Sequence, residues 1–374
     1  LFLIVGGTGF GKTHLMRVLA EGAHLCLPGI NSLREAQRVI QFEIDFTRGA
    51  TRRQMLSGFR SNGDPLQLAY LLQHYAYRAR GNEAYTRATL FVLPDSVPRL
   101  RKELAPLVER GLRIEAAVCG PKDLGMFGYR ALIANARGLQ GSNKPAYMTL
   151  IEALISDAGE DITPMALHDL LADKGIDARA LPAMQLQLRN LAALVRPGVQ
   201  LNDCLRAPHP VFFLLESCMM SPDVLLPFQA ILLNALGRPL RDGSDPHKWI
   251  FLDEFNKSAE NAVMIEAGRQ SGQERRHRKV TLVVNGQRGS GFDEGFMSQA
   301  TMLAVFRMTS HKEIRTVKER FSVLAEVPNE TFMNLRAGEC MLAALQSTNP
   351  QSVFRLCVRP TVTYAGGETL RTTN

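Results

Sequence analysis

A glycine-rich run near the start of the chain carries a lysine and a threonine at the spacing that phosphate binding requires. The run has the form G-x-x-x-x-G-K-[ST] and consists of Gly6, Gly7, Thr8, Gly9, Phe10, Gly11, Lys12 and Thr13. Its glycines allow backbone N–H groups to curl around β- and γ-phosphates. Lys12 then neutralises phosphate charge, and Thr13 supplies an oxygen ligand for Mg²⁺. The pattern predicts a binding site for the phosphates of ATP.

The elements expected around this run fit the same interpretation. An apolar strand over Leu1–Val5 leads into the glycines, and a helical run over His14–Ala20 follows them. Such a helix directs the positive end of its dipole at the phosphates. An ordinary glycine-rich turn between a strand and a helix would not need a lysine and a threonine at these two positions.

A pair of acids more than two hundred positions later supplies the other groups that such a site needs. Asp253 and Glu254 follow the apolar strand expected over Trp249–Leu252. In a phosphate-loop enzyme, one carboxylate holds the magnesium shell and a second polarises the attacking water. We therefore expect Asp253 in the first role and Glu254 in the second. The alternative is an acidic strand end or helix cap with no catalytic role.

An amide side chain follows another apolar strand, expected over Val280–Val284. Asn285, Gly286 and Gln287 come directly after it. A polar amide at the carboxyl end of a strand can contact a γ-phosphate and orient water, because ligands of parallel sheets bind at that edge. Gln287 is our candidate for this contact, and a solvated turn glutamine is the alternative.

Composition indicates a globular protein with a basic surface. Of the 374 residues, 45% are hydrophobic and the net charge is +8. The pI near 9.3 suits a polyanionic partner without establishing one. The six cysteines include no C-x-x-C pair, so we expect reduced, structural thiols. No run of about 18 uncharged apolar residues predicts a membrane span. The chain begins inside a strand, so we expect an N-terminal part before Leu1, where a membrane anchor could lie.

Alternating strands and helices predict an α/β fold with a mostly parallel sheet, helices on both faces and a helical insertion. A helix over Pro98–Glu109 fits a βαβ unit, and Thr163 before Pro164 fits an N-cap. We divide the chain into a first core part (1–119), a helical insertion (120–205) and a second core part (206–374). The expected strands are Leu1–Val5, Phe42–Phe46, Thr89–Leu93, Arg113–Val118, Val211–Leu215, Trp249–Leu252, Val280–Val284 and Met302–Phe306, and the expected helices of the insertion are Pro145–Ser156, Pro164–Lys174 and Pro182–Val195.

The order of these motifs resembles the HerA–FtsK superfamily of DNA-pumping P-loop ATPases, which includes type IV secretion coupling proteins and virus packaging motors. The discriminating parts are Gly268–Gly272, Gln287 and the strand ending at Phe306–Arg307, and Leu335–Leu342 follows them in the same order. The resemblance covers residues 1–20 and about 206–345, and the long connection before Asp253 is closest to the HerA and coupling-protein branches.

This resemblance implies a RecA-like fold, a cytoplasmic location and a hexameric ring. A membrane anchor before Leu1 would place the ring at the inner face of the membrane, beside secretion or packaging machinery. Gln287 is then the sensor, and Arg269 is an arginine finger offered to the nucleotide of a neighbouring subunit. Such a finger stabilises transition-state charge. The chain departs from the family at Asp45–Gly49, which only loosely matches the usual turn, and at the enlarged connection Gln273–Lys279.

Two basic clusters are candidates for contact with a polyanionic partner. The run Gln273–Lys279 holds four cations and one carboxylate, and Arg48, Arg52 and Arg53 form the second cluster. Either could grip DNA phosphates in a pore or be a solvated loop. Neither contains an aromatic residue, which favours contact with the DNA backbone regardless of base sequence.

The function predicted from these features is an ATP-driven DNA translocase. The alternative is an ATP-binding assembly ATPase of a secretion or capsid machine that moves no DNA. A small-substrate kinase is disfavoured by the helical insertion and by Gly268–Arg269. Scattered histidines disfavour a zinc enzyme, and Ser290 lacks the spacing of a nucleophile elbow.

Overall fold

The fold is built on a ten-stranded sheet with the strand order β10-β9-β8-β1-β7-β6-β2-β5-β3-β4. The computed structural model describes residues 1–25, 38–43, 88–109, 111–134, 144–159, 161–172, 174, 180–206, 210–215, 222–240, 242–253, 255, 279–287, 289, 292, 294–345 and 352–359. The strands are β1 (Phe2–Val5), β2 (Arg38–Glu43), β3 (Ala88–Val92), β4 (Leu112–Ala116), β5 (Val211–Leu214), β6 (Lys248–Leu252), β7 (Val280–Gly286), β8 (Met302–Phe306), β9 (Glu339–Ala344) and β10 (Val353–Cys357).

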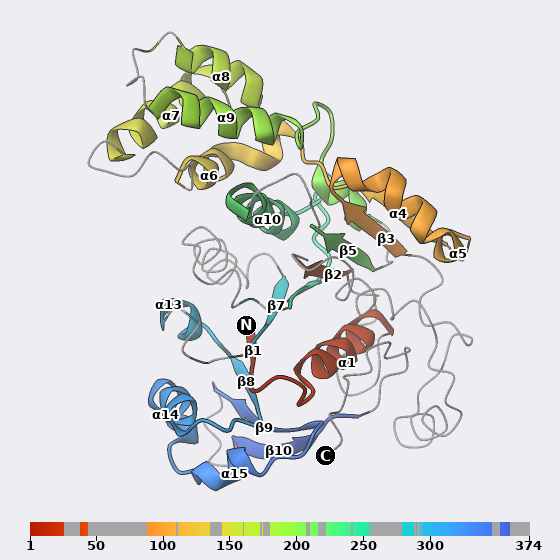
Figure 1. The fold of residues 1–374 in the computed structure, drawn as a ribbon, viewed down its shortest axis with the longest axis vertical. Coiled ribbons are helices and arrows are strands. Elements are labelled where there is room, and N and C mark those ends of the chain that lie inside the picture. The colour runs from red at the N-terminus through yellow and green to blue at the C-terminus, as the bar shows by residue number, and fades with distance from the viewer. Residues whose placement is uncertain are drawn as a thin grey trace.

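The sheet is parallel from β8 to β4, and β9 and β10 add an antiparallel hairpin at the β8 edge. Parallel strands covered on both faces are apolar throughout. Accordingly, every residue of β3 and β5 is buried. Figure 1 shows the sheet running from β3, beside α4, down to β9 and β10, with α7, α8 and α9 above it.

Helices cover both faces of this sheet (Figure 1). Their bounds are α1 (Lys12–Leu25), α4 (Val97–Glu103), α5 (Ala105–Val108), α6 (Pro121–Ala134), α7 (Lys144–Ala158), α8 (Pro164–Ala172), α9 (Ala180–Ala192), α10 (Pro222–Gly237), α13 (Glu294–Met297), α14 (His311–Arg320) and α15 (Asn329–Met333), with 3₁₀ turns at Pro94–Ser96, Leu201–Leu205 and Ser322–Leu324.

Alternation along the strands assigns the helices to faces. In β5, Phe212 belongs to the apolar cluster that includes Leu100 of α4, whereas Phe213 belongs to the cluster that includes α6 and α10. In β6, Phe251 packs in the cluster of α1 and its neighbour Leu252 in that of α10. Helices α1, α4 and α5 therefore share one face, and α6, α10, α13, α14 and α15 lie toward the other.

Between β4 and β5 the described elements are the helices α6, α7, α8 and α9 and the 3₁₀ turn Leu201–Leu205, and α7, α8 and α9 correspond to the three predicted helices. Helix α6 packs on α10, while α7, α8 and α9 form a group at one end of the molecule (Figure 1). The two ends of this region are hydrogen-bonded to each other around Gly120, and we call this junction the neck. Cys119 N–H donates to Leu194 O at 3.0 Å. The buried carboxylate of Asp123 accepts from the N–H groups of Gly120 and Leu201, both at 2.9 Å.

Several predicted elements differ in their limits. Strand β2 begins at Arg38, four residues before the predicted start at Phe42. The prediction missed this part because Arg38 and Gln41 interrupt the apolar run. Residues 44–46 lie outside the described part. The helix predicted over Pro98–Glu109 is two helices separated at Leu104, since Pro106 cannot donate to a preceding turn. Helix α6, which the sequence did not predict, is interrupted at Gly125, where φ is 51°.

The predicted N-cap is confirmed. Ala166 N–H donates to Thr163 Oγ1 at 3.2 Å, and Pro164 is the first residue of α8. A threonine oxygen at this position satisfies a helix N–H that has no intrahelical partner.

Among the described residues, no helix is both long enough and apolar enough to cross a membrane.

Candidate functional site

The glycine-rich loop connects the carboxyl end of β1 to α1, as the sequence predicted, and packs closely against the end of β8. Gly6 has φ 145°, and a Cβ there would lie 2.7 Å from Phe306 Cβ. Gly11 has φ 110°, and a Cβ there would lie 3.3 Å from Gly338 Cα. Only glycine adopts these positive φ values without strain and also leaves room for Phe306 and Gly338. Thr8 and Gly9, at the tip of the loop, are exposed.

The lysine of the loop is already folded over it. Lys12 is 8% exposed, and its Nζ donates to Gly7 O at 2.7 Å. Thr13 is the second residue of α1 and is half-buried. The N-terminus of α1 and the Lys12 ammonium thus lie on the same loop, the combination that binds anions.

Asp253 lies at the same edge of the sheet as this loop. Strands β1 and β6 both run parallel to β7, which lies between them. Ile4 pairs with Asn285, and Leu252 pairs with Val284, so Asp253 follows at the level of Asn285. With adjacent strands about 4.8 Å apart, Asp253 lies roughly 10 Å from β1. The phosphate loop and the first acid of the pair therefore meet at one edge, as the sequence required.

Asn285 contacts Asp253 directly, and sequence reasoning did not find it. Its side chain is 1% exposed, and its Nδ2 donates to Asp253 Oδ1 at 2.5 Å. Gln287, the amide that we proposed from the sequence, follows β7 and is exposed. The available signal was an amide directly after three apolar residues, Leu282–Val284, within reach of the acid on the neighbouring strand.

The oxygen donors at this edge suit magnesium. Thr13 offers a hydroxyl and Asp253 a carboxylate, and Mg²⁺ prefers one or two such oxygens together with water and phosphate. Glu254 and Arg269 lie outside the described residues. The basic clusters lie outside them too, apart from Lys279, which is exposed.

Arg307 contacts the phosphate loop from the end of β8. Gly7 N–H donates to Arg307 O at 2.8 Å, and the guanidinium carbon lies 5.2 Å from the centre of the Phe10 ring. A cation over an aromatic ring at this distance is attracted to it. From the sequence, Arg307 was part of the family resemblance but had no role assigned to it.

Residues just before β9 and just after β10 also contact the loop and α1. Gly338 N–H donates to Phe10 O at 3.0 Å, and Val358 N–H donates to Gly338 O at 2.8 Å. Arg359 Nη1 lies 3.1 Å from Glu21 Oε2 of α1, with both side chains buried. Residues from the two ends of the described chain thus pack together beside the loop and support it.

His14 of α1 joins this support. Its Nε2 lies 2.9 Å from Arg359 O. Burial lowers the pKa of His14 below its ordinary value, despite the opposing effects of that hydrogen bond and of Glu21. The neutral ring that donates from Nε2 is thereby favoured.

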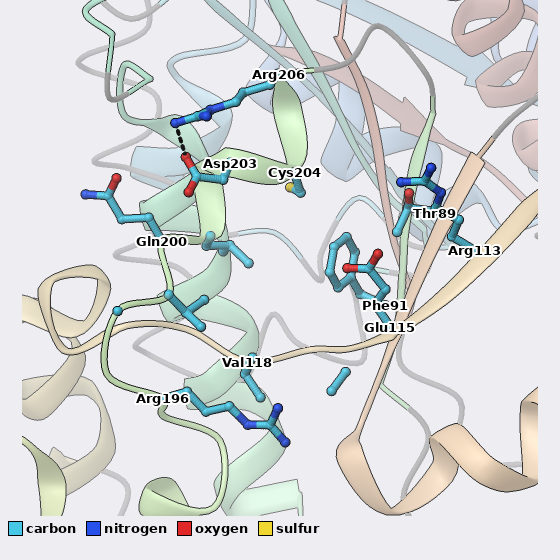
Figure 2. A pocket seen from close by; sticks show the side chains of 14 residues that line it. Thr89, Phe91, Arg113, Glu115, Val118, Arg196, Gln200, Asp203, Cys204 and Arg206 are labelled. Carbon is cyan, nitrogen blue, oxygen red and sulfur yellow. Dashed lines mark ion pairs between the residues drawn. The ribbon is translucent and has the colours of Figure 1, made fainter.

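A separate pocket of about 600 Å³ lies at the β4 edge of the sheet, between β3, β4 and the chain that returns from the helical insertion (Figure 2). Arg113, Arg196 and Arg206 line it together with Glu115 and Asp203, and Arg206 pairs with Asp203 at 3.0 Å. Because β4 is six strands from β1, this pocket is not part of the phosphate site.

The pocket also contains a thiol, Cys204. Burial, followed by the charges of Glu115, Asp203 and Asp123, raises the pKa of Cys204 above its ordinary value. The thiol therefore stays protonated at neutral pH and is a poor nucleophile.

Comparison of the whole structure with solved structures identifies its fold. The bacterial conjugative coupling protein TrwB without its first 70 residues matches with a TM-score of 0.58 and 11% identity, over 97% of this chain and 86% of that one. TrwB in complex with ADP and Mg²⁺ gives 0.57 and 12%, over 96% and 84%. TrwB with a non-hydrolysable ATP analogue gives 0.57 and 13%, over 96% and 84%. No protein-family model and no curated protein matches the sequence.

At this level of identity the match shows the fold alone. The predicted fold class, an α/β P-loop NTPase with a mostly parallel sheet and helices on both faces, is confirmed. The resemblance drawn from the motifs is confirmed at the level of the fold: this chain has the fold of the conjugative coupling protein TrwB.

Proposed function

We propose that this protein is an ATPase that hydrolyses MgATP to move DNA, as a ring of identical subunits. The observation that carries the ATPase part is the meeting of the Lys12 loop and Asp253 at one sheet edge, across the single strand β7. The fold shared with TrwB supports it, because that protein forms complexes with ADP and Mg²⁺ and with an ATP analogue.

The described side chains fit distinct tasks in nucleotide binding. Lys12 Nζ, now on Gly7 O, would exchange that carbonyl for a phosphate oxygen, which is a stronger acceptor because it is charged. Thr13 and Asp253 would hold Mg²⁺, whose charge offsets that of the phosphates. The N–H groups of the loop and of the first turn of α1 would bind the remaining phosphate oxygens.

The remaining roles rest on the sequence and its resemblance. Glu254 would polarise the attacking water, and Gln287 would sense the γ-phosphate. Arg269 would reach the nucleotide of the neighbouring subunit. DNA as partner, a hexamer, a cytoplasmic location and attachment to a membrane or a secretion or packaging machine through a part before Leu1 belong to the same proposal. It draws support from the net charge of +8 and from the coupling-protein fold.

Two substitutions test the catalytic assignment. Lys12→Ala should remove most nucleotide binding, and Glu254→Gln should keep binding while lowering kcat by about 10²- to 10⁴-fold. Lys122→Ala is a matched control, because this lysine of α6 is 65% exposed and pairs only with the exposed Asp161 among the ion pairs of the described residues. Wild-type turnover in both site variants would refute the assignment.

Mixing subunits tests the shared site. Arg269→Ala should lower turnover by about 10³-fold or more if the arginine acts as a finger. When Arg269→Ala and Lys12→Ala subunits are mixed in one ring, turnover should differ from the value expected if each subunit acted alone. The reason is that each site would use groups from two subunits. Dilution behaviour expected of independent monomers would contradict the ring.

DNA stimulation separates the motor from the assembly ATPase. A motor that grips phosphates should show ATP hydrolysis stimulated by DNA, with a steep decline as salt rises, because phosphate contacts release counterions. Equal hydrolysis with and without DNA would favour an assembly ATPase that moves no DNA.

A further inference from the structure

Asn285 is a polar side chain in a position where the sheet otherwise holds apolar ones. It belongs to β7, where Leu282, Val283 and Val284 are fully buried, and it is itself 1% exposed. Burying an amide in such surroundings is unfavourable unless it is hydrogen-bonded. The amide donates to Asp253 Oδ1 at 2.5 Å, a bond to a carboxylate and therefore stronger than one between neutral groups.

The position of β7 makes this contact specific to the site. On one side Asn285 pairs with Ile4, two residues before the phosphate loop begins at Gly6. On the other side, the pairing of Val284 with Leu252 brings Asn285 level with Asp253. Asn285 thus lies on the strand between that of the phosphate loop and that of the acid, and its amide donates to the acid.

We infer that Asn285 is a positioning residue that fixes the orientation of the Asp253 carboxylate for the magnesium shell of the bound nucleotide. This inference rests on the proposed function. A carboxylate accepts at both oxygens, so a donor on Oδ1 sets the rotation of the group and the direction of Oδ2. Groups that orient metal-shell carboxylates in this way commonly change metal affinity by about 10- to 100-fold when they are removed.

Asn285 and Gln287 then have separate tasks. Asn285 is buried in β7 and acts on Asp253, whereas Gln287 is exposed beyond the end of the strand. Replacing Asn285 should therefore change the response to Mg²⁺. Replacing Gln287 should chiefly change the turnover of nucleotide that is already bound.

The experiment measures ADP binding to the full chain by calorimetry across a titration of Mg²⁺. Asn285→Leu keeps the approximate volume and removes the donor. It should raise the Mg²⁺ concentration for half-maximal tightening of ADP binding by about 10- to 100-fold. Binding of ADP without Mg²⁺ should stay within about twofold of wild type, because the phosphate loop is unchanged.

A second buried asparagine provides the control. Asn202 is 6% exposed and donates from Nδ2 to Arg238 O and Pro239 O, both at 3.1 Å, beside α10. Asn202→Leu should lower the melting temperature yet leave the Mg²⁺ dependence unchanged. A merely structural Asn285 would behave in the same way. Asn285→Thr, which keeps a shorter O–H donor, provides the test if Asn285→Leu does not fold, and should shift the Mg²⁺ dependence in the same direction.

The outcomes separate a failure of this inference from a failure of the proposed ATPase function on which it rests. If Lys12→Ala abolishes ADP binding while both Asn285 variants keep the wild-type Mg²⁺ dependence, the role of Asn285 is refuted and the ATPase proposal stands. If the wild-type chain binds no ADP at any Mg²⁺ concentration, the proposed function itself fails.

Discussion

Replacing Arg359 with methionine removes the cation from an ion pair that lies inside the protein and joins the end of β10 to α1. The guanidinium lies 3.1 Å from the Glu21 carboxylate, with side-chain exposures of 9% and 1%. Arg359 also donates to Val18 O at 3.3 Å. Methionine retains much of the apolar stem, so the main change is the loss of a buried charge opposite Glu21.

The size of the effect follows from this burial. Breaking a buried pair by removing one partner destabilises a protein by about 3–5 kcal/mol, because the other charge loses its compensation. We expect that range for Arg359→Met and for Glu21→Leu. Replacing both partners with apolar side chains is often nearly neutral. The double variant should therefore be more stable than either single variant.

Equilibrium urea unfolding of the wild type, the two single variants and the double variant measures the coupling free energy between Arg359 and Glu21. Arg355→Met is the matched control in β10, four residues before Arg359, because Arg355 pairs with Glu339 at the surface with 53% of its side chain exposed. It should lower the free energy of unfolding by less than about 1 kcal/mol. If the effects of Arg359→Met and Glu21→Leu simply add in the double variant, the pair does not stabilise the fold as argued.

Three further predictions concern the neck, the titration of α1 and the support of the phosphate loop. Gly120→Ala should destabilise the fold by about 1–3 kcal/mol in thermal unfolding, since its Cβ would lie 2.0 Å from Val199 O; an unchanged melting temperature would contradict the close approach. Because burial lowers the pKa of His14 below 6.5, its contribution to stability is complete above about pH 6.5 and is lost as pH falls toward the folded pKa. His14→Gln should therefore flatten the decline in unfolding free energy between pH 7.5 and 5.5, and an equally steep decline would refute this. Arg307→Met and Phe10→Leu should each weaken ADP binding by about two- to fivefold in calorimetry, because each removes the contact between the cation and the ring. The double variant should bind ADP no more weakly than either single variant. Additive losses of affinity would show that the two side chains do not act together.

The parts of the site that sequence could predict are those encoded by neighbouring residues. The phosphate loop needs its glycines, Lys12 and Thr13 within eight positions, and Asp253 is marked by the apolar strand before it. Both were placed at the correct edge because parallel strands direct their carboxyl ends the same way.

The parts that sequence missed depend on register between distant segments. Asn285 meets Asp253 only because β7 pairs with β6 in one specific alignment. Arg307 meets Phe10 across 297 positions, and Arg359 meets Glu21 across 338. Periodicity identifies the strands but does not give their order or alignment, so the amide outside the strand, Gln287, was proposed before the one inside it.

The order of strands also determines when the site can form during synthesis of the chain. Both neighbours of β1 come late, because Phe2 pairs with Val283 and with Met302. β1 is therefore synthesised nearly three hundred residues before the strands that pair with it. Contacts this distant in sequence slow folding, and an unpaired apolar strand is prone to aggregate. A nascent chain released before β7 would leave both edges of that strand without their partners.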